Sequence, residues 1–206
     1  MPHPTYIAVA GNIGCGKSTL VDFICRTYHV EPFFEPNAEN PYLADFYADM
    51  KRWAFHSQIY FLTHKFRIHQ ELEQRRGLRT VVQDRTIFED AEVFAAYLHR
   101  RGYINDRDWR VYTDLYHTIL TSLRPPDLMI YLRASVATIR KRIKLRARPE
   151  EQAIPTVYLR ALNDLYEEWF AGYQRSPTIV LDTDELDYLT DLVDRLDVRK
   201  TIEQYL

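Results

Sequence analysis

The chain has 206 residues, of which 46% are hydrophobic and 27% charged, and this composition suffices for one compact domain spanning 1–206. Its net charge of −2 excludes a global basic field of the kind that gathers a nucleic-acid polymer. Because the chain has no signal-like start and no stretch of roughly 18 apolar residues, we expect a cytoplasmic protein without a membrane partner.

Five short apolar runs predict strands that are buried on both faces of a sheet, because apolar and polar residues do not alternate in them. These runs span 6–10, 30–34, 80–83, 128–132 and 178–181. Helical spacing of apolar residues predicts helices at 18–29, two within 40–74, and others at 89–101, 106–123, 136–148 and 156–173. Strands that alternate with helices indicate an α/β fold with a parallel sheet.

A phosphate-binding loop follows the first predicted strand and opens the first predicted helix. The pattern G-x-x-x-x-G-K-[ST] is complete, and Thr19 follows it. In this pattern Lys17 reaches the β- and γ-phosphates of ATP, and the Ser18 hydroxyl binds Mg²⁺. The alternative is a glycine turn without a ligand. The loop residues are Gly11, Asn12, Ile13, Gly14, Cys15, Gly16, Lys17 and Ser18.

The two cysteines have no predicted metal or redox role. Cys15 and Cys25 lack the paired spacing or the neighbouring histidines of a zinc site, and two cysteines cannot form a disulfide framework. We interpret both as small residues in or beside a helix.

A carboxylate stands just beyond the second predicted strand. Parallel α/β sheets bind ligands at the carboxyl ends of their strands, so Glu35 is placed to meet the phosphoryl acceptor and to take a proton from an attacking hydroxyl. Glu31, inside or before the strand, is less well placed. The alternative for Glu35 is a solvated glutamate in a loop.

An acidic and a basic residue end the third predicted strand. Asp84 fits the second acidic position of a P-loop protein, in the magnesium shell. Arg85 can bind the acceptor oxygen or the transferring phosphoryl group. A structural Asp-Arg pair is the alternative.

Three arginines gather at the end of the helix predicted at 136–148. Arg142 and Arg146 share a helix face, and Arg148 lies at the fraying end before Pro149. They suit a lid, at about 142–151, that closes over ATP, excludes water and neutralises charge on the phosphoryl oxygens. A solvated basic helix face is the alternative.

In this order, these motifs resemble those of the deoxyribonucleoside kinases, over residues 6–187. Further matching positions are Arg52-Trp53, Gln58, Glu150-Glu151, Ile154-Pro155 and Tyr158-Leu159. The resemblance implies a P-loop kinase fold with a five-stranded parallel sheet, flanked by helices and usually dimeric. It also implies nucleotide salvage by transfer of the ATP γ-phosphoryl group to a 5′-hydroxyl.

The resemblance also implies site roles. Glu35 is the general base, Arg85 supports it near the 5′-oxygen, and the three lid arginines contact phosphates. Gln58 pairs with the base edge and Phe94 stacks on the base. The residues that hold the 3′-hydroxyl are Tyr47 and Glu151.

The base preference is inferred from a few positions of the same resemblance. Asp90 falls where members that act on cytosine or purines carry an acidic residue, so thymidine is disfavoured. Lys65 stands where deoxycytidine kinase carries an arginine, and lysine lacks the planar fork. Glu39-Asn40-Pro41-Tyr42 and Gln83-Asp84-Arg85-Thr86 look more like the bacterial purine enzymes. The favoured substrate is deoxyadenosine or deoxyguanosine, with deoxycytidine second.

Two rival functions remain from the sequence. A nucleoside monophosphate kinase shares the loop and lid but needs extra arginines for an acceptor phosphate, where this chain offers Glu35 and aromatic residues. A non-catalytic nucleotide switch usually carries an Asn-Lys-x-Asp stretch, which is absent from the sequence.

Overall fold

A parallel five-stranded sheet forms the centre of the computed structural model, which describes residues 5–34, 40–186 and 191–204. The strand order is β2-β3-β1-β4-β5. Each predicted strand is confirmed, with its ends shifted by no more than one residue. All of β1 and all but the last residue of β4 are buried, as expected for strands covered on both faces. The strands are β1 (Tyr6–Ala10), β2 (Glu31–Phe33), β3 (Val81–Asp84), β4 (Leu128–Arg133) and β5 (Thr178–Asp182).

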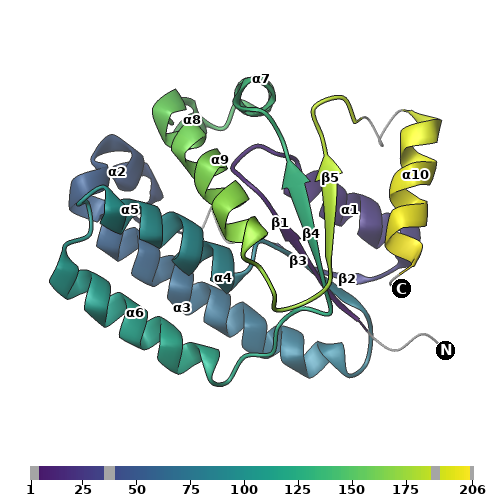
Figure 1. Ribbon diagram of the computed structural model, residues 1–206, viewed down its shortest axis with the longest axis horizontal. Helices are drawn as coiled ribbons and strands as arrows, with labels where there is room; N and C mark the ends of the chain where they lie inside the picture. The colour runs from purple at the N-terminus through teal and green to yellow at the C-terminus, as the bar shows by residue number, and fades with distance from the viewer. Residues whose placement is uncertain (1–4, 35–39, 187–190, 205–206) are drawn as a thin grey trace.

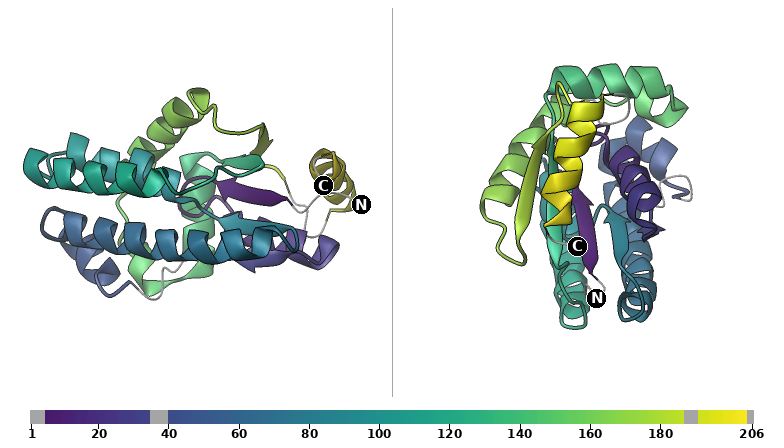
Figure 2. Two further views of the ribbon diagram at one scale, coloured as in Figure 1. Left: turned by 90° about the horizontal axis from the view of Figure 1, so that it is seen from below. Right: turned by 90° about the vertical axis from the view of Figure 1, so that its right-hand side faces the viewer.

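Helices cover both faces of the sheet (Figures 1 and 2). The longest, α3, lies side by side with α6, and the two extend beyond the sheet. The strand arrows in Figure 1 point toward α7 and α8, so the carboxyl edge of the sheet lies there. The helices are α1 (Lys17–Tyr28), α2 (Leu43–Ala48), α3 (Met50–Arg76), α4 (Ile87–Glu89), α5 (Ala96–Arg100), α6 (Asp106–Leu120), α7 (Val136–Arg146), α8 (Pro149–Gln152), α9 (Thr156–Ala171) and α10 (Leu192–Glu203).

Two predicted helices differ from the observed ones. The helix expected at 89–101 begins as α4, continues as the π-helical segment η2 (Asp90–Ala95) and ends as α5. The helix expected at 136–148 stops at α7, because Ala147 adopts a left-handed conformation (φ 55°). Pro149 then starts α8, where its missing N–H costs no hydrogen bond.

The sequence patterns did not predict α10. Asp191 caps this helix by accepting hydrogen bonds from Val193 N and Asp194 N, and its buried residues are Val198 and Ile202. With so small an apolar stripe, the helix depends on packing rather than on its own periodicity. No helix of the described residues combines the length and the apolar character needed to cross a membrane.

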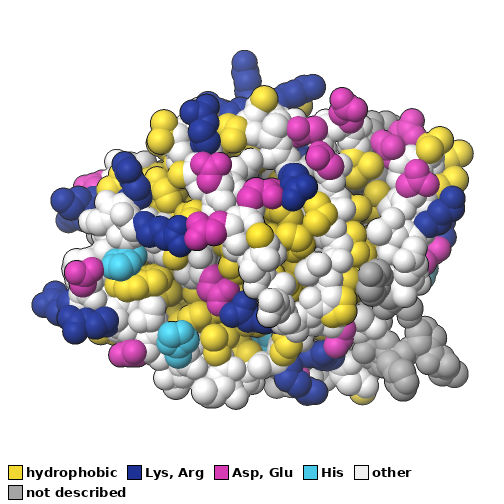
Figure 3. Space-filling view, in the orientation of Figure 1, with side chains coloured by type: hydrophobic (Ala, Val, Ile, Leu, Met, Phe, Trp, Pro, Cys, Tyr) yellow, Lys and Arg dark blue, Asp and Glu magenta, His cyan; other side chains and the backbone are white. Residues whose placement is uncertain are grey.

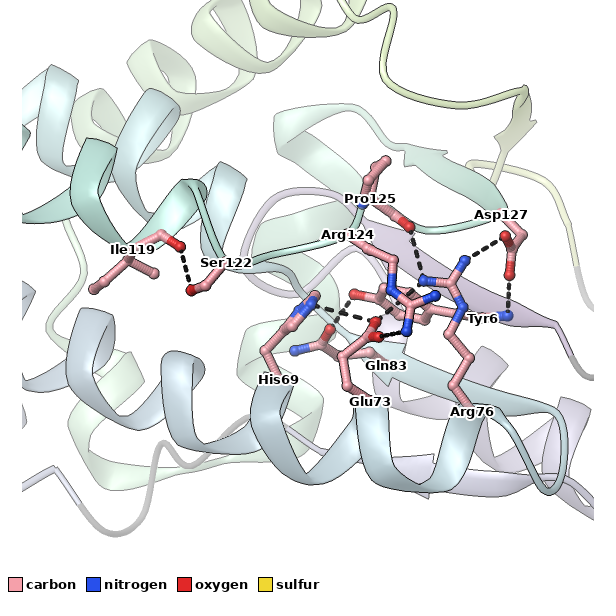
Figure 4. Close-up of polar contacts among 10 residues, drawn as sticks. All are labelled: Tyr6, His69, Glu73, Arg76, Gln83, Ile119, Ser122, Arg124, Pro125 and Asp127. Carbon is pink, nitrogen blue, oxygen red and sulfur yellow. Dashed lines mark hydrogen bonds and ion pairs between the residues drawn. The ribbon is translucent and has the colours of Figure 1, made fainter.

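A network of polar side chains ties α3 to the amino edge of the sheet (Figure 4). Arg76 donates to Asp127, whose other oxygen accepts from Tyr6 N at 2.7 Å. Glu73 accepts from Arg76 at 3.1 Å and lies 3.6 Å from His69. Burial lowers the pKa of His69 to about 4, so its ring is neutral at pH 7. This end of the molecule therefore holds a structural network, remote from the phosphate loop.

Candidate active site

The phosphate loop connects β1 to α1 and depends on glycine. Gly11 has φ 144°, and a Cβ there would lie 2.7 Å from both Cys15 Sγ and Leu132 O. Gly16, which precedes the first residue of α1, has φ 110°. An L side chain rarely adopts these conformations, so the glycines let the backbone turn its amides inward at the start of α1.

Lys17 lies within the loop, with its side chain curled back onto it. It is 6% exposed, and its Nζ donates to Asn12 O at 3.0 Å. The Asn12 side chain accepts from Ile13 N at 2.7 Å and donates to Leu159 O at 2.9 Å, which anchors the loop to α9. The loop is thus anchored to α9 through Asn12, whose carbonyl group also holds Lys17.

The end of β3 faces the start of α1. Ser18 Oγ donates to Asp84 Oδ2 at 2.6 Å. The other carboxylate oxygen, Asp84 Oδ1, is buried and has no hydrogen-bond partner among the described residues. An orphaned buried carboxylate oxygen is costly, so a cation beside it would be favoured.

Arg85 has a strained backbone. Its φ is 59°, a left-handed conformation that costs a non-glycine residue about 1–3 kcal/mol. Lys65, which is fully buried, donates to Asp84 O at 3.1 Å and to Arg85 O at 2.6 Å. The Arg85 guanidinium donates to Gly11 O at 3.2 Å and lies 4.5 Å from the centre of the Phe94 ring. These contacts aim Arg85 across the cleft beside the phosphate loop.

One cleft at the carboxyl edge of the sheet brings most of the predicted site residues together. Glu35 lies outside the described residues. Arg142, Gly11, Asn12, Cys15, Gly16 and Thr19 are not among the cleft's lining residues. The predicted site residues that do line it are Ile13, Gly14, Lys17, Ser18, Tyr47, Gln58, Asp84, Arg85, Asp90, Phe94, Arg146, Arg148 and Glu151.

Two helices place polar groups at the acceptor end of the cleft. Gln58 on α3 is 3% exposed, and its Oε1 is buried without a hydrogen-bond partner among the described residues. Asp90 on η2 is equally buried. Phe94 lies one turn further along η2 and packs edge-on against Tyr166. Such a pocket provides hydrogen-bonding groups and aromatic surface for a flat polar ligand.

The arginines at 142–148 divide between two positions. Arg146 Nε donates to Glu151 at 3.0 Å, and Arg148 contacts the same carboxylate at 3.4 Å. Arg142 instead donates to Cys15 O at 2.7 Å and to Thr183 Oγ1 at 2.9 Å. Arg142 therefore supports the backbone of the phosphate loop from outside the cleft, whereas Arg146 and Arg148 line the cleft. In Figure 3, basic side chains gather over α7 at the top of the molecule.

Some cleft residues had no predicted role. Phe61 lies one turn from Gln58 on α3, so helical spacing could have identified it. Lys65, which the resemblance had singled out, is not among the lining residues but supports the strained turn, and no pattern in the sequence signals its contacts with Asp84 O and Arg85 O. Leu43, Phe46 and Tyr158 complete the apolar lining.

The family profile of deoxynucleoside kinases matches residues 7–206. The chain belongs to this family. Deoxynucleoside kinases are ATP-dependent phosphotransferases, so the predicted fold and enzyme class are confirmed, and the comparisons favour neither rival function.

Relatives of this deoxynucleoside kinase match along most of their length. A deoxyadenosine/deoxycytidine kinase of Bacillus subtilis is 35% identical, over 93% of this chain and 88% of the relative. A deoxyguanosine kinase of Lactobacillus acidophilus is also 35% identical, over 93% of this chain and 86% of the relative. A solved deoxyadenosine kinase from M. mycoides with bound dATP is 33% identical, with a TM-score of 0.83 over 97% of this chain and 99% of that one.

Proposed function

We propose that this kinase transfers the γ-phosphoryl group of ATP to the 5′-hydroxyl of deoxyadenosine or deoxyguanosine, with deoxycytidine as a second substrate. The observation that carries the proposal is the cleft itself, which joins the phosphate loop to a buried pocket containing Gln58, Asp90 and Phe94. The names of the relatives in B. subtilis and L. acidophilus support this choice of substrates. The test is ADP release with each of the four natural deoxynucleosides.

Donor binding uses the loop amides, the positive end of the α1 dipole and Lys17. Ser18 and Asp84 would hold Mg²⁺, because Asp84 Oδ1 is a buried carboxylate oxygen without another partner among the described residues. When bound, the ion neutralises charge on the β- and γ-phosphates.

Replacing Asp84 with Asn keeps the shape but removes a charge that attracts Mg²⁺. We expect the Mg²⁺ concentration for half-maximal activity to rise about tenfold or more, since oxygen ligands with less charge bind the ion more weakly. Steady-state rates in a Mg²⁺ titration at fixed ATP measure this shift. Asp182→Asn is the control, because Asp182 ends β5 at the same sheet edge but is not among the residues that line the cleft. An unchanged titration for Asp84→Asn would remove Asp84 from the magnesium site.

On the acceptor side, Glu35 takes the proton from the 5′-hydroxyl. The 5′-oxygen attacks the γ-phosphorus at the same time, and the bond between the γ-phosphorus and ADP breaks. Arg85 stabilises the charge that develops on the transferring group. Tyr47 and Glu151 bind the 3′-hydroxyl, so a sugar that lacks this group would leave buried polar atoms unpaired. Phe94 stacks on the base.

We propose that residues 142–151 act as the lid. The space in the cleft is about 60 Å³, below the ~300–1,000 Å³ typical of small-molecule pockets, which supports an outward movement of the lining when a ligand enters. Glu151 is bound to Arg146 and Arg148. Phosphate oxygens would compete with Glu151 for these arginines and so release Glu151 toward the sugar. Arg142 would reach the phosphates only by leaving Cys15 O.

The dimer and the cytoplasmic location stay predictions. Val111 and Leu115 are exposed on α6, at 56% and 40%, which supports a helix-helix interface between two copies.

Asp90 is proposed to set the base preference together with Gln58. An adenine amino group or a protonated ring nitrogen of guanine could donate to the carboxylate at a position where thymine presents a methyl group or a carbonyl. The wild type is therefore expected to use a purine deoxynucleoside with a higher kcat/KM than thymidine. Asp90→Ala is expected to lower the ratio of kcat/KM for the purine deoxynucleoside to kcat/KM for thymidine about tenfold. The variant should lose more activity on the preferred base than on thymidine.

A competition assay with the four deoxynucleosides at equal concentration measures the ranking. The control is Glu92→Gln, which changes a carboxylate of the same helix that binds Trp169 and Arg175. Thymidine as the best wild-type substrate would contradict the specificity proposal. An unchanged ranking in Asp90→Ala would remove Asp90 as the residue that recognises the base.

A further inference from the structure

Glu89, the last residue of α4, is fully buried, and four hydrogen bonds converge on its carboxylate. Oε1 accepts from Gly11 N at 3.1 Å and from the Tyr166 hydroxyl at 3.0 Å. Oε2 accepts from Thr86 N at 2.9 Å and from Thr86 Oγ1 at 3.2 Å. Since all four partners can donate, the ionised carboxylate satisfies each of them.

Local helix capping accounts for only half of these contacts. Thr86 and Glu89 form a capping box, in which the glutamate accepts from the N-cap N–H. The second oxygen leaves the helix and binds Gly11, which is distant in the sequence and begins the phosphate loop. Burial raises the pKa of the Glu89 carboxyl, and Arg85, the bonds from Thr86 and Gly11, and Lys17 oppose that rise.

The two segments that Glu89 joins belong to different halves of the site. Gly11 lies on the ATP side, and its carbonyl accepts from Arg85 at 3.2 Å. Thr86 directly follows Arg85, whose left-handed backbone sets the direction of the guanidinium. Gly11, Arg85, Thr86 and Glu89 thus form a closed ring of bonds that spans the boundary between phosphate donor and acceptor.

We propose that Glu89 is a positioning residue for phosphoryl transfer, which fixes Arg85 relative to the phosphate loop. The proposal rests on the roles proposed above for the loop and for Arg85. In-line transfer depends on the alignment of donor and acceptor, and a displacement of about 1 Å can cost a hundredfold in rate. Glu89 is not among the residues that line the cleft, so its carboxylate acts through the two segments that it holds.

Glu89→Gln tests this role with nearly the same shape. Gln has one acceptor oxygen and one NH₂ donor, so its NH₂ must face either Gly11 N–H or Thr86 N–H. We expect kcat to fall about tenfold or more, while KM for ATP and for the deoxynucleoside each change less than threefold, because most loop amides still bind phosphate. Tyr166→Phe removes one of the four bonds and should reduce kcat less, in the same direction.

Tyr6→Phe is the matched control. Tyr6 and Tyr166 are both fully buried, and the Tyr6 hydroxyl donates to Gln83 in β3. We expect this variant to lose thermal stability as Tyr166→Phe does, yet to keep kcat within twofold of the wild type.

Two outcomes would overturn the proposal. The first is a kcat within twofold of the wild type for Glu89→Gln, or for Tyr166→Phe if Glu89→Gln does not fold. The second is an equal loss of kcat in Tyr6→Phe and Tyr166→Phe when the two variants have the same Tm. General destabilisation would then explain the loss of kcat in Tyr166→Phe. The wild type tests the proposed function separately, since absence of deoxynucleoside-dependent ADP release would contradict that function before any variant is compared.

Discussion

Lys17→Ala is expected to abolish phosphoryl transfer, with a loss of at least about a hundredfold in kcat/KM. Lys17 is buried, and its ammonium group donates to a backbone oxygen of the loop, Asn12 O, at 3.0 Å. The lysine can turn from this carbonyl to the β- and γ-phosphates, whose negative charge it then neutralises in the transition state. The measurement is kcat/KM for the purified variant, with Tm as the test of folding.

Lys144→Ala controls for the loss of one positive charge. Lys144 is exposed on α7, in the same basic region but outside the cleft lining. This variant should retain wild-type activity. A folded Lys17→Ala that kept more than about a tenth of the wild-type kcat/KM, a loss below ~1.4 kcal/mol, would contradict the assigned role.

Glu35→Gln is expected to lower kcat by about a hundredfold or more while ATP still binds. Gln keeps the approximate shape of the side chain but cannot accept the proton of the 5′-hydroxyl, and general-base catalysis typically contributes 10²–10⁴-fold. Single-turnover rates measure the chemical step, and a titration with ADP measures nucleotide binding independently of it. If the single-turnover rate and ADP binding were both lost, a role of Glu35 confined to proton transfer would be contradicted.

Glu31→Gln is the control for the base. The residue opens β2 opposite Val81, and its carboxylate pairs with Arg75 at 3.8 Å and Arg79 at 3.5 Å. It therefore lies at the amino edge of the sheet, away from the phosphate loop at the carboxyl edge. We expect a kcat close to that of the wild type. If Glu35→Gln retained full kcat, the base would lie elsewhere in the cleft.

The central fold could be predicted because its signals are local. Uninterrupted apolar runs located all five strands, and glycines followed by Lys17 located the phosphate loop between a strand and a helix. The helices within 40–74 were also predicted, because apolar spacing persists over many turns. By contrast, α10 was missed, since its short apolar stripe gains stability only by packing on the rest of the molecule.

The roles within the cleft depended on contacts between distant segments. The sequence predicted Asp84 and Arg85 at the end of a strand. Only the structure showed that the backbone of Arg85 is left-handed and that Lys65 stabilises this turn. It also separated Arg142, which binds the loop backbone, from Arg146 beside Glu151. Helical spacing had indicated a shared face for the two arginines, yet their partners lie on other elements.

The sequence by itself therefore determined the sheet, the phosphate loop and the kind of chemistry, because strand burial, glycine geometry and residue type act over a few neighbouring positions. Only the tertiary structure decided how the loop is held. In the sequence Glu89 resembles an ordinary capping residue and Gly11 is the first residue of the phosphate loop, and only folding places Gly11 N 3.1 Å from Glu89 Oε1. A hydrogen bond between residues so far apart in the chain leaves no periodic trace in either segment, because its geometry is set by the packing of β1, β3 and α4.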